Sequence, residues 1–228
     1  MKFLKMKIWL NIILFLLITR TTSSAFAQNH YSDSLLQLLK KTNDDKIKCS
    51  TFYLLGDYFQ TINSDSSFMY FDESIKLSRK LKDEFMTAKS LKGKGWTYYL
   101  LSEYDSAKTE YEKSLAIIEK LLKIKSNSAE EIIKLKTQKA GCLRNIGVLY
   151  DAKSLYPEAI KLYFEALKVY QDIDDKIGIS RVYGSLGISY RDQKLYDRAL
   201  EYYNKSISIN IENNNSKGND ANYVNLGN

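Results

Sequence analysis

Apolar residues recur along most of this chain at the three- and four-residue spacing that predicts amphipathic helices. The pattern is clearest over residues 143–167, which are predicted to form two short helices that meet at a turn near Leu155 and Tyr156. No run alternates apolar and polar residues with the period of two that a strand requires. The sequence therefore predicts an all-α fold.

Glycines stand inside several of the predicted helices. A glycine in a helix interior costs about 1 kcal/mol relative to alanine, so its presence needs a reason. We expect the reason to be close approach, because Gly147 and Ala159 have little or no side chain and let two helices pack tightly. Aromatic side chains are expected to fill the space around them. Five glycines occupy equivalent contexts: Gly56, Gly95, Gly147, Gly187 and Gly227.

A longer motif surrounds each of these glycines. A large apolar or aromatic residue stands four positions before, and an aromatic residue stands three positions after the first four glycines. Further on, a small residue is followed four positions later by Phe71, Tyr111, Tyr163 or Tyr203. This pattern resembles the tetratricopeptide repeat (TPR) signature over residues 46–228. The resemblance implies a right-handed α-solenoid of antiparallel helix pairs, with four repeats and the first helix of a fifth.

The repeats depart from the usual length. The glycine spacings are 39, 52, 40 and 40 residues, whereas a repeat of this family usually has about 34. Longer helices explain this difference. The extra residues between Gly95 and Gly147 are predicted to lengthen one helix pair and make it project past its neighbours, with Ser128 and Glu131 forming a capping box. The projection is either a family variant or a docking ridge.

The N-terminal residues have a different character. Residues 1–27 resemble a secretory signal peptide, with a basic start, an apolar run over residues 8–18 and the small residues Ala25 and Ala27 before the expected cleavage site. An uncleaved anchor is the alternative. The protein is therefore expected to be periplasmic or secreted after cleavage near Ala27. Residues 28–45 are expected to form a helix that caps the array.

The charge and the cysteine content limit which functions and which covalent links the chain can have. The formal net charge is +7, but residues 1–27 contribute four positive charges and no acid, which leaves +3 for the rest. Such a mild and interspersed charge favours a solvated surface over nucleic-acid binding. Cys49 and Cys142 lie two repeats apart, too far for a disulfide, and are expected to be free and buried.

The sequence lacks a constellation of catalytic residues. His30 is the only histidine, no cysteine–histidine cluster has metal-ligand spacing, and neither a phosphate-binding loop nor a nucleophile elbow is present. We therefore expect no enzyme activity, no metal and no cofactor.

The resemblance implies a concave face, lined by first helices, that binds an extended peptide or a partner's helix. The residues at its groove positions are Asp57, Gln60, Lys89, Lys92, Trp96, Tyr99, Arg144, Asn145, Asp151, Arg181, Ser185, Arg191, Asn225 and Asn228. Asn145 and Asn225 share one repeat position, and their amides can donate to and accept from a peptide backbone. Lys92, Arg144, Arg181 and Arg191 can bind an acidic segment, and Trp96 adds an aromatic surface.

These sequence features lead to two alternative hypotheses about function. The first is an exported, non-enzymatic scaffold that binds a protein or peptide. The second is the sensory region of a bacterial membrane signalling protein, because the chain also resembles the exported TPR part of such proteins. In that case a histidine kinase or DNA-binding output would lie beyond residue 228.

Overall fold

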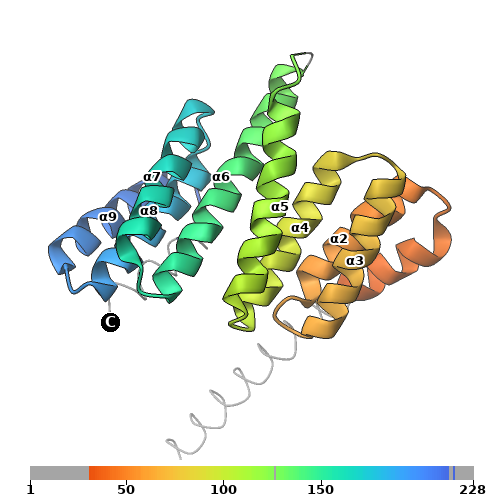
Figure 1. Cartoon of the computed structure of the whole chain (residues 1–228), viewed down its shortest axis with the longest axis horizontal. Helices are drawn as coiled ribbons and strands as arrows, with labels where there is room; N and C mark the ends of the chain where they lie inside the picture. The colour runs from red at the N-terminus through yellow and green to blue at the C-terminus, as the bar shows by residue number, and fades with distance from the viewer. Residues whose placement is uncertain (1–30, 126, 216–217, 219–228) are drawn as a thin grey trace, which may run out of the picture.

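The computed structural model describes residues 31–125, 127–215 and 218. The expected signal segment over residues 1–27, His30, Asn225 and Gly227 lie outside the described residues. In the described part, residues 31–41 are helical and no strand occurs. The following helices are α2 (Asp45–Phe59), α3 (Ser64–Lys80), α4 (Glu84–Leu100), α5 (Tyr104–Leu122), α6 (Ala129–Ala152), α7 (Tyr156–Asp172), α8 (Lys176–Asp192) and α9 (Tyr196–Glu212). They stack as antiparallel pairs in chain order (Figure 1).

The contacts between helices define a solenoid. Within each pair the two helices contact one another, and the second helix of each pair contacts the first helix of the next. The first helices α2, α4, α6 and α8 also contact each other in series, whereas the described second helices do not. First helices therefore lie on the inner, tighter side of the curve and second helices on the outer side. The predicted all-α solenoid is confirmed.

An aromatic ring packs onto the glycine of each described first helix. A Cβ built on Gly56 would stand 2.8 Å from the ring of Phe71, one on Gly95 2.7 Å from Tyr111, and one on Gly147 2.6 Å from Tyr163. Real Cβ contacts are never this short, so only glycine fits. The sequence predicted close approach of two helices at Gly147, and the structure shows that the ring itself takes the place of the missing side chain.

Aromatic rings also pack onto glycines at the junctions between repeats. Phe71 lies between Gly56 of its own pair and Gly93 of the next, where a Cβ would stand 2.5 Å from the ring. Gly178 of α8 accommodates the ring of Tyr170 of α7 in the same way. Rings and glycines thus interlock both within and between repeats, which fixes how each pair sits on its neighbour.

Helix starts follow the predicted signals. Ser128 and Glu131 form the capping box of α6, in which the Glu131 amide donates to Ser128 Oγ at 3.2 Å and the Ser128 amide donates to Glu131 Oε2 at 2.7 Å. Asp65, Asp105 and Asp197 stand in the first turns of α3, α5 and α9, where the helix dipole favours an acid. Pro157 lies in the first turn of α7.

Helix ends depart from the usual glycine signal. The residues with positive φ are Lys82, Ser102, Ser154, Asp174, Lys194 and Asn214, one after each of six helices. Each is followed by an amide that bonds back to the last turn, as when Leu155 N donates to Tyr150 O at 2.9 Å. This is a Schellman-type ending, in which a non-glycine residue costs about 1 kcal/mol. None of the described glycines has a positive φ, so these glycines serve packing rather than helix ends.

The second repeat produces a projecting hairpin. Helices α5 and α6 have 19 and 24 residues, whereas α7, α8 and α9 have 17 each. Figure 1 shows the tip of this pair standing beyond its neighbours. Cys49 and Cys142 are free and buried, as predicted. Every helix in the described residues is too short or too polar to cross a bilayer.

The ring and glycine contacts generate a test by double-mutant cycle. Gly187→Ala should destabilise the protein by about 1–3 kcal/mol in urea unfolding, because the added methyl group overlaps the Tyr203 ring. In a Tyr203→Ala background the same change should become neutral or stabilising by up to about 1 kcal/mol, because alanine favours a helix. Equal effects in both backgrounds would show that the ring does not set the requirement for glycine.

Candidate functional site

The predicted site residues in the described part of the chain lie on three successive inner helices. Lys92 and Trp96 lie on α4, Arg144 and Asn145 on α6, and Arg181 and Arg191 on α8, the three successive first helices that contact each other. We call the inner side of these three helices the groove. Because its residues come from helices held in register by the rings and glycines below them, the spacing along the groove is set by the core.

Arg144 connects two of these helices. Its Nη1 donates to Ser185 Oγ on α8 at 3.2 Å, and its Nη2 donates to Asn145 Oδ1 at 3.2 Å. Asn145 is only 8% exposed, so its amide oxygen faces the guanidinium. The sequence predicted that the amides of Asn145 and Asn225 bind a peptide backbone. In the structure, the Asn145 amide oxygen instead accepts a hydrogen bond from Arg144.

An aromatic surface lies beside the cations. The rings of Trp96 and Tyr99 pack with centroids 4.7 Å apart, and Tyr99 contacts Tyr104 at 6.1 Å. Trp96 is half-buried and remains accessible from the groove. A flat aromatic surface next to polar donors suits an extended segment with mixed side chains.

Positive charges concentrate where α4, α6 and α8 meet. Burial lowers the pKa of the Lys92 ammonium, and the positive charges of Arg144, Lys89 and Arg181 lower it further. None of these four side chains has an ion pair within 4.0 Å in the part of the chain that the structure describes. Asp57 is the carboxylate that acts on Lys89 and Lys92, and the four cations exceed it in charge. This excess of positive charge favours binding of an anionic group.

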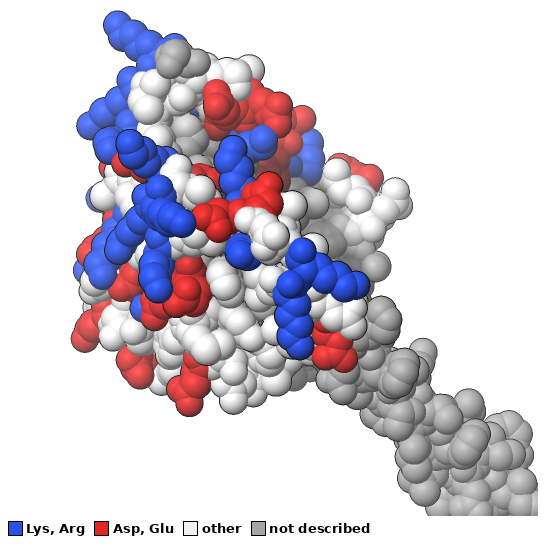
Figure 2. All heavy atoms as spheres, turned by 90° about the vertical axis from the view of Figure 1, so that its right-hand side faces the viewer, with Lys and Arg blue, Asp and Glu red and all other residues white. Residues whose placement is uncertain are grey.

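Other parts of the surface lack this concentration. Figure 2 shows cations and carboxylates lying among one another on the face at the N-terminal end. Lys80 pairs with Asp45 at 3.0 Å, Lys94 with Asp72 at 2.6 Å and Lys120 with Glu84 at 2.6 Å. Arg191 also pairs with a carboxylate, that of Asp192 at 2.9 Å, so it differs from the other predicted groove cations.

Two residues of this region were not among the predicted site residues. Gly141 of α6 leaves space for Lys92, whose Nζ lies 3.1 Å from the point where a Cβ would stand, and the hydroxyl of Tyr170 lies 3.5 Å from the same point. Gly141 lies outside the repeated glycine positions, and that irregularity was the available signal. Tyr170 is 5% exposed and packs in the core, so its sequence position gave no sign of a role at the surface.

A half-buried carboxylate, that of Asp151, lies at the other end of α6. Tyr163 donates its hydroxyl to Asp151 Oδ2 at 2.5 Å, while Oδ1 has no hydrogen-bond partner in the described structure. Burial raises the pKa of Asp151 from 3.8 to about 6, and the hydrogen bond from Tyr163 only partly offsets it. Asp151 is thus less acidic than an ordinary surface aspartate.

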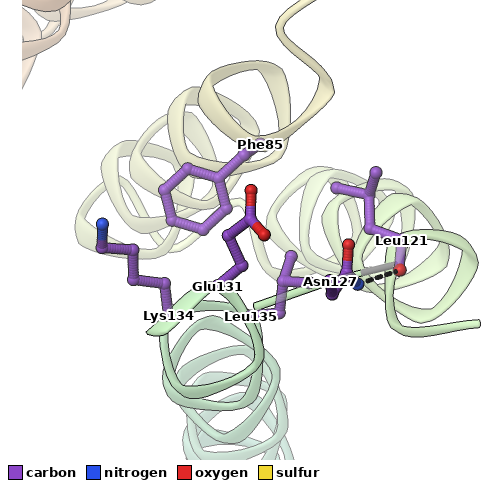
Figure 3. Close-up of a pocket in the computed structure, with 6 residues that line it drawn as sticks. All are labelled: Phe85, Leu121, Asn127, Glu131, Lys134 and Leu135. Carbon is purple, nitrogen blue, oxygen red and sulfur yellow. Dashed lines mark hydrogen bonds between the residues drawn. The ribbon is translucent and has the colours of Figure 1, made fainter. Parts of the chain in front are cut away.

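A small pocket lies near the tip of the projecting hairpin. It has a volume of about 240 Å³, and Phe85, Leu121 and Leu135 form its apolar wall (Figure 3). Both charges at its rim are engaged, since Glu131 accepts from the Ser128 amide and Lys134 Nζ donates to Glu130 Oε1 at 2.6 Å. The pocket therefore presents no set of unsatisfied polar groups to a ligand.

Comparison with known families confirms the resemblance in part of the chain. Residues 139–212 match the family model described as tetratricopeptide repeat. "Uncharacterized protein ycf37" of Guillardia theta is 37% identical over 62 residues, which are 27% of this chain and 34% of that protein. "Photosystem I assembly protein Ycf3" of Rippkaea orientalis (strain PCC 8801 / RF-1) is 36% identical over 64 residues, 28% of this chain and 35% of that protein. The matches span about a third of either relative.

The fold is shared with solved structures. A Rap protein in complex with competence and sporulation factor superposes with a TM-score of 0.69 and 16% identity, covering 85% of this chain and 51% of that one. This similarity concerns the fold alone.

The raised pKa of Asp151 predicts how stability depends on pH. The pKa of Asp151 is higher in the folded state than in the unfolded state, so protonation of this carboxyl stabilises the folded state. The stabilisation is complete below about pH 4 and is lost as the pH rises through about 6. Asp151→Asn should remove it, so that the difference in unfolding free energy between pH 4.5 and 7.5 changes by about 1–2 kcal/mol.

The exposed Asp105, whose carboxylate accepts a hydrogen bond from Lys153 at 2.7 Å, provides the control variant Asp105→Asn. Carbon-13 NMR of the Asp151 carboxyl carbon reports the pKa directly. A titration midpoint near that of a surface aspartate would contradict the assignment.

Proposed function

We propose that this chain, which carries tetratricopeptide repeats, is an exported non-enzymatic scaffold that binds an extended protein segment in its groove. The observation that carries the proposal is the group of cations Lys92, Arg144 and Arg181, which form no ion pair with any described residue and lie on the same helices as the aromatic surface of Trp96 or on the next ones. Such a surface recognises acidic and aromatic side chains in a segment that lies along the groove.

Export is supported by the sequence of residues 1–27. Their basic start, apolar run and small residues at Ala25 and Ala27 are typical of a secretory signal peptide. Detection of a mature N-terminus just after Ala27 by mass spectrometry of the protein from its native host would establish cleavage.

The similar proteins agree with a binding role. One relative is called an assembly protein, and the Rap protein was solved in complex with a factor. The array itself also fits, because a solenoid presents an extended inner surface whose residues repeat with the helix pairs. A segment that follows the groove would contact one helix after another, so its affinity would be spread over several repeats.

Selection from a random peptide library tests the groove. Peptides selected on the full chain should be enriched in Asp and Glu, because the groove presents Lys92, Arg144 and Arg181. The double variant Arg144→Ala/Asn145→Ala should bind these peptides about tenfold more weakly or worse, since a charged hydrogen-bonding group is lost. Its helix content by circular dichroism should stay unchanged.

The control for this experiment removes a charge from the outer surface. Lys168→Met on α7 lies on an exposed outer position and should leave binding unchanged. If the selected peptides bind wild type and the double variant equally, the groove is not the binding surface.

A further inference from the structure

The contacts of Tyr170 point to a specific site within the groove. Tyr170 belongs to the second helix α7, yet its ring passes over Gly178 of α8 and its hydroxyl ends at Gly141 of α6. A side chain at Gly178 would block this path, because a Cβ there would stand 2.3 Å from the ring, whereas a Cβ on Gly141 would stand 3.5 Å from the hydroxyl, at ordinary contact distance. The ring is 5% exposed, and the hydroxyl has no hydrogen bond among the described residues. A phenol directed to the inner surface without a partner is available as a donor to a ligand.

A lysine reaches the same place from the other side. Lys92 of α4 has its Nζ 3.1 Å from the position that a Cβ on Gly141 would occupy, while the Tyr170 hydroxyl lies 3.5 Å from that position. The Lys92 ammonium and the Tyr170 hydroxyl therefore both lie next to the backbone of Gly141. We call the surface formed by Lys92, Tyr170 and the guanidinium groups of Arg144 and Arg181 the Lys92–Tyr170 site.

Charged groups of both signs act on this hydroxyl. Burial raises the pKa of Tyr170 to about 12, the positive charges of Arg144 and Arg181 lower it, and the negative charge of Asp175 raises it. Arg144 uses one N–H toward Ser185 and one toward Asn145. A guanidinium has five N–H donors, so others stay available. Arg181 is exposed and has no ion pair or side-chain hydrogen bond in the described structure.

The charge around the site is unbalanced. The cations Lys89, Lys92, Arg144 and Arg181 outnumber the two carboxylates that act on the site, which are Asp57 beside the lysines and Asp175 beside Tyr170. Among the described residues, no carboxylate lies within 4.0 Å of the Lys92 ammonium. A carboxylate ligand brings one negative charge and two oxygens. A phosphate monoester brings about −1.5 to −2 charges and three acceptor oxygens, which matches an ammonium, a hydroxyl and two guanidinium groups.

We propose that the Lys92–Tyr170 site binds a phosphate group carried by a phosphorylated residue of the protein segment in the groove. The proposal rests on the proposed function and names the class of partner. Lys92 and Arg181 supply charge from either side, Arg144 supplies planar donors, and the Tyr170 hydroxyl supplies a neutral donor from below. The glycine at position 141 leaves the space beside the helix in which the Lys92 ammonium and the Tyr170 hydroxyl lie.

Binding of inorganic phosphate provides the first test. Phosphate titrated at constant ionic strength into the nitrogen-15-labelled full chain should cause saturable shifts of the Gly141 amide. Lys92→Met and Tyr170→Phe should each weaken this binding about fivefold or more, since each removes one donor. The matched variants Lys168→Met and Tyr203→Phe remove the same groups elsewhere and should retain wild-type binding. Equal binding by all four variants would overturn the proposal.

A peptide library made in three forms identifies the source of the phosphate. Its fixed central residue is phosphoserine, serine or glutamate. The phosphoserine form should bind about tenfold tighter than the serine form, and Tyr170→Phe should reduce this preference without changing the affinity of the serine form. Equal affinity of the phosphoserine and serine forms would overturn the phosphate site while leaving groove binding intact. If no form binds although phosphate does, the site stands and the segment-binding function fails.

Discussion

The packing of an aromatic ring onto a bare helix backbone is the constraint on which this structure depends. Phe71, Tyr111, Tyr163 and Tyr203 occupy the same place in successive second helices and are at most 2% exposed. Each fills the volume that a side chain on the facing glycine would take. Because the ring is rigid and the glycine has no alternative rotamer, the two helices have little freedom to slide or rotate relative to one another.

This packing also couples the core to the groove. The hydroxyl of Tyr163 bonds Asp151 on the inner helix α6, and that of Tyr170 ends at Gly141 on the same helix. The tyrosines of the outer helices therefore place polar atoms on the inner side, whereas Phe71 in the first repeat contributes only its ring. The unpaired hydroxyls of Tyr111 and Tyr203 have a cost, since a buried donor without a partner loses its hydration. Changes in the core are consequently expected to alter the groove.

Much of the fold could be predicted from the sequence, because the relevant signals are local or periodic. The glycines, the capping box at Ser128 and the long pair α5–α6 each follow from spacing along the chain. The helix ends could not be predicted in the same way, because residues such as Lys82 and Lys194 adopt positive φ without a glycine to mark it. Tertiary packing of the next helix decides those turns.

For the candidate site, the sequence predicted which residues lie on the inner helices but not which side chains contact one another. Repeat register places Lys92, Arg144 and Arg181 on inner helices, but it does not reveal that Arg144 bonds Ser185 and Asn145. It also gives no reason to connect Tyr170 with Lys92, since their approach to the same point depends on Gly141 and Gly178, which are not among the five equivalent glycines. Such contacts require the angle between successive pairs, which a single repeat does not encode.

The most direct measurement of the central claim is a nuclear Overhauser spectrum of the folded protein with assigned glycine and aromatic resonances. Strong cross-peaks between the Gly147 Hα protons and the ring protons of Tyr163, with upfield shifts of those Hα protons from the ring current, are the result that ring-on-glycine packing predicts. Absence of these cross-peaks in a well-dispersed spectrum, with Gly147 Hα at ordinary helical shifts, would contradict it.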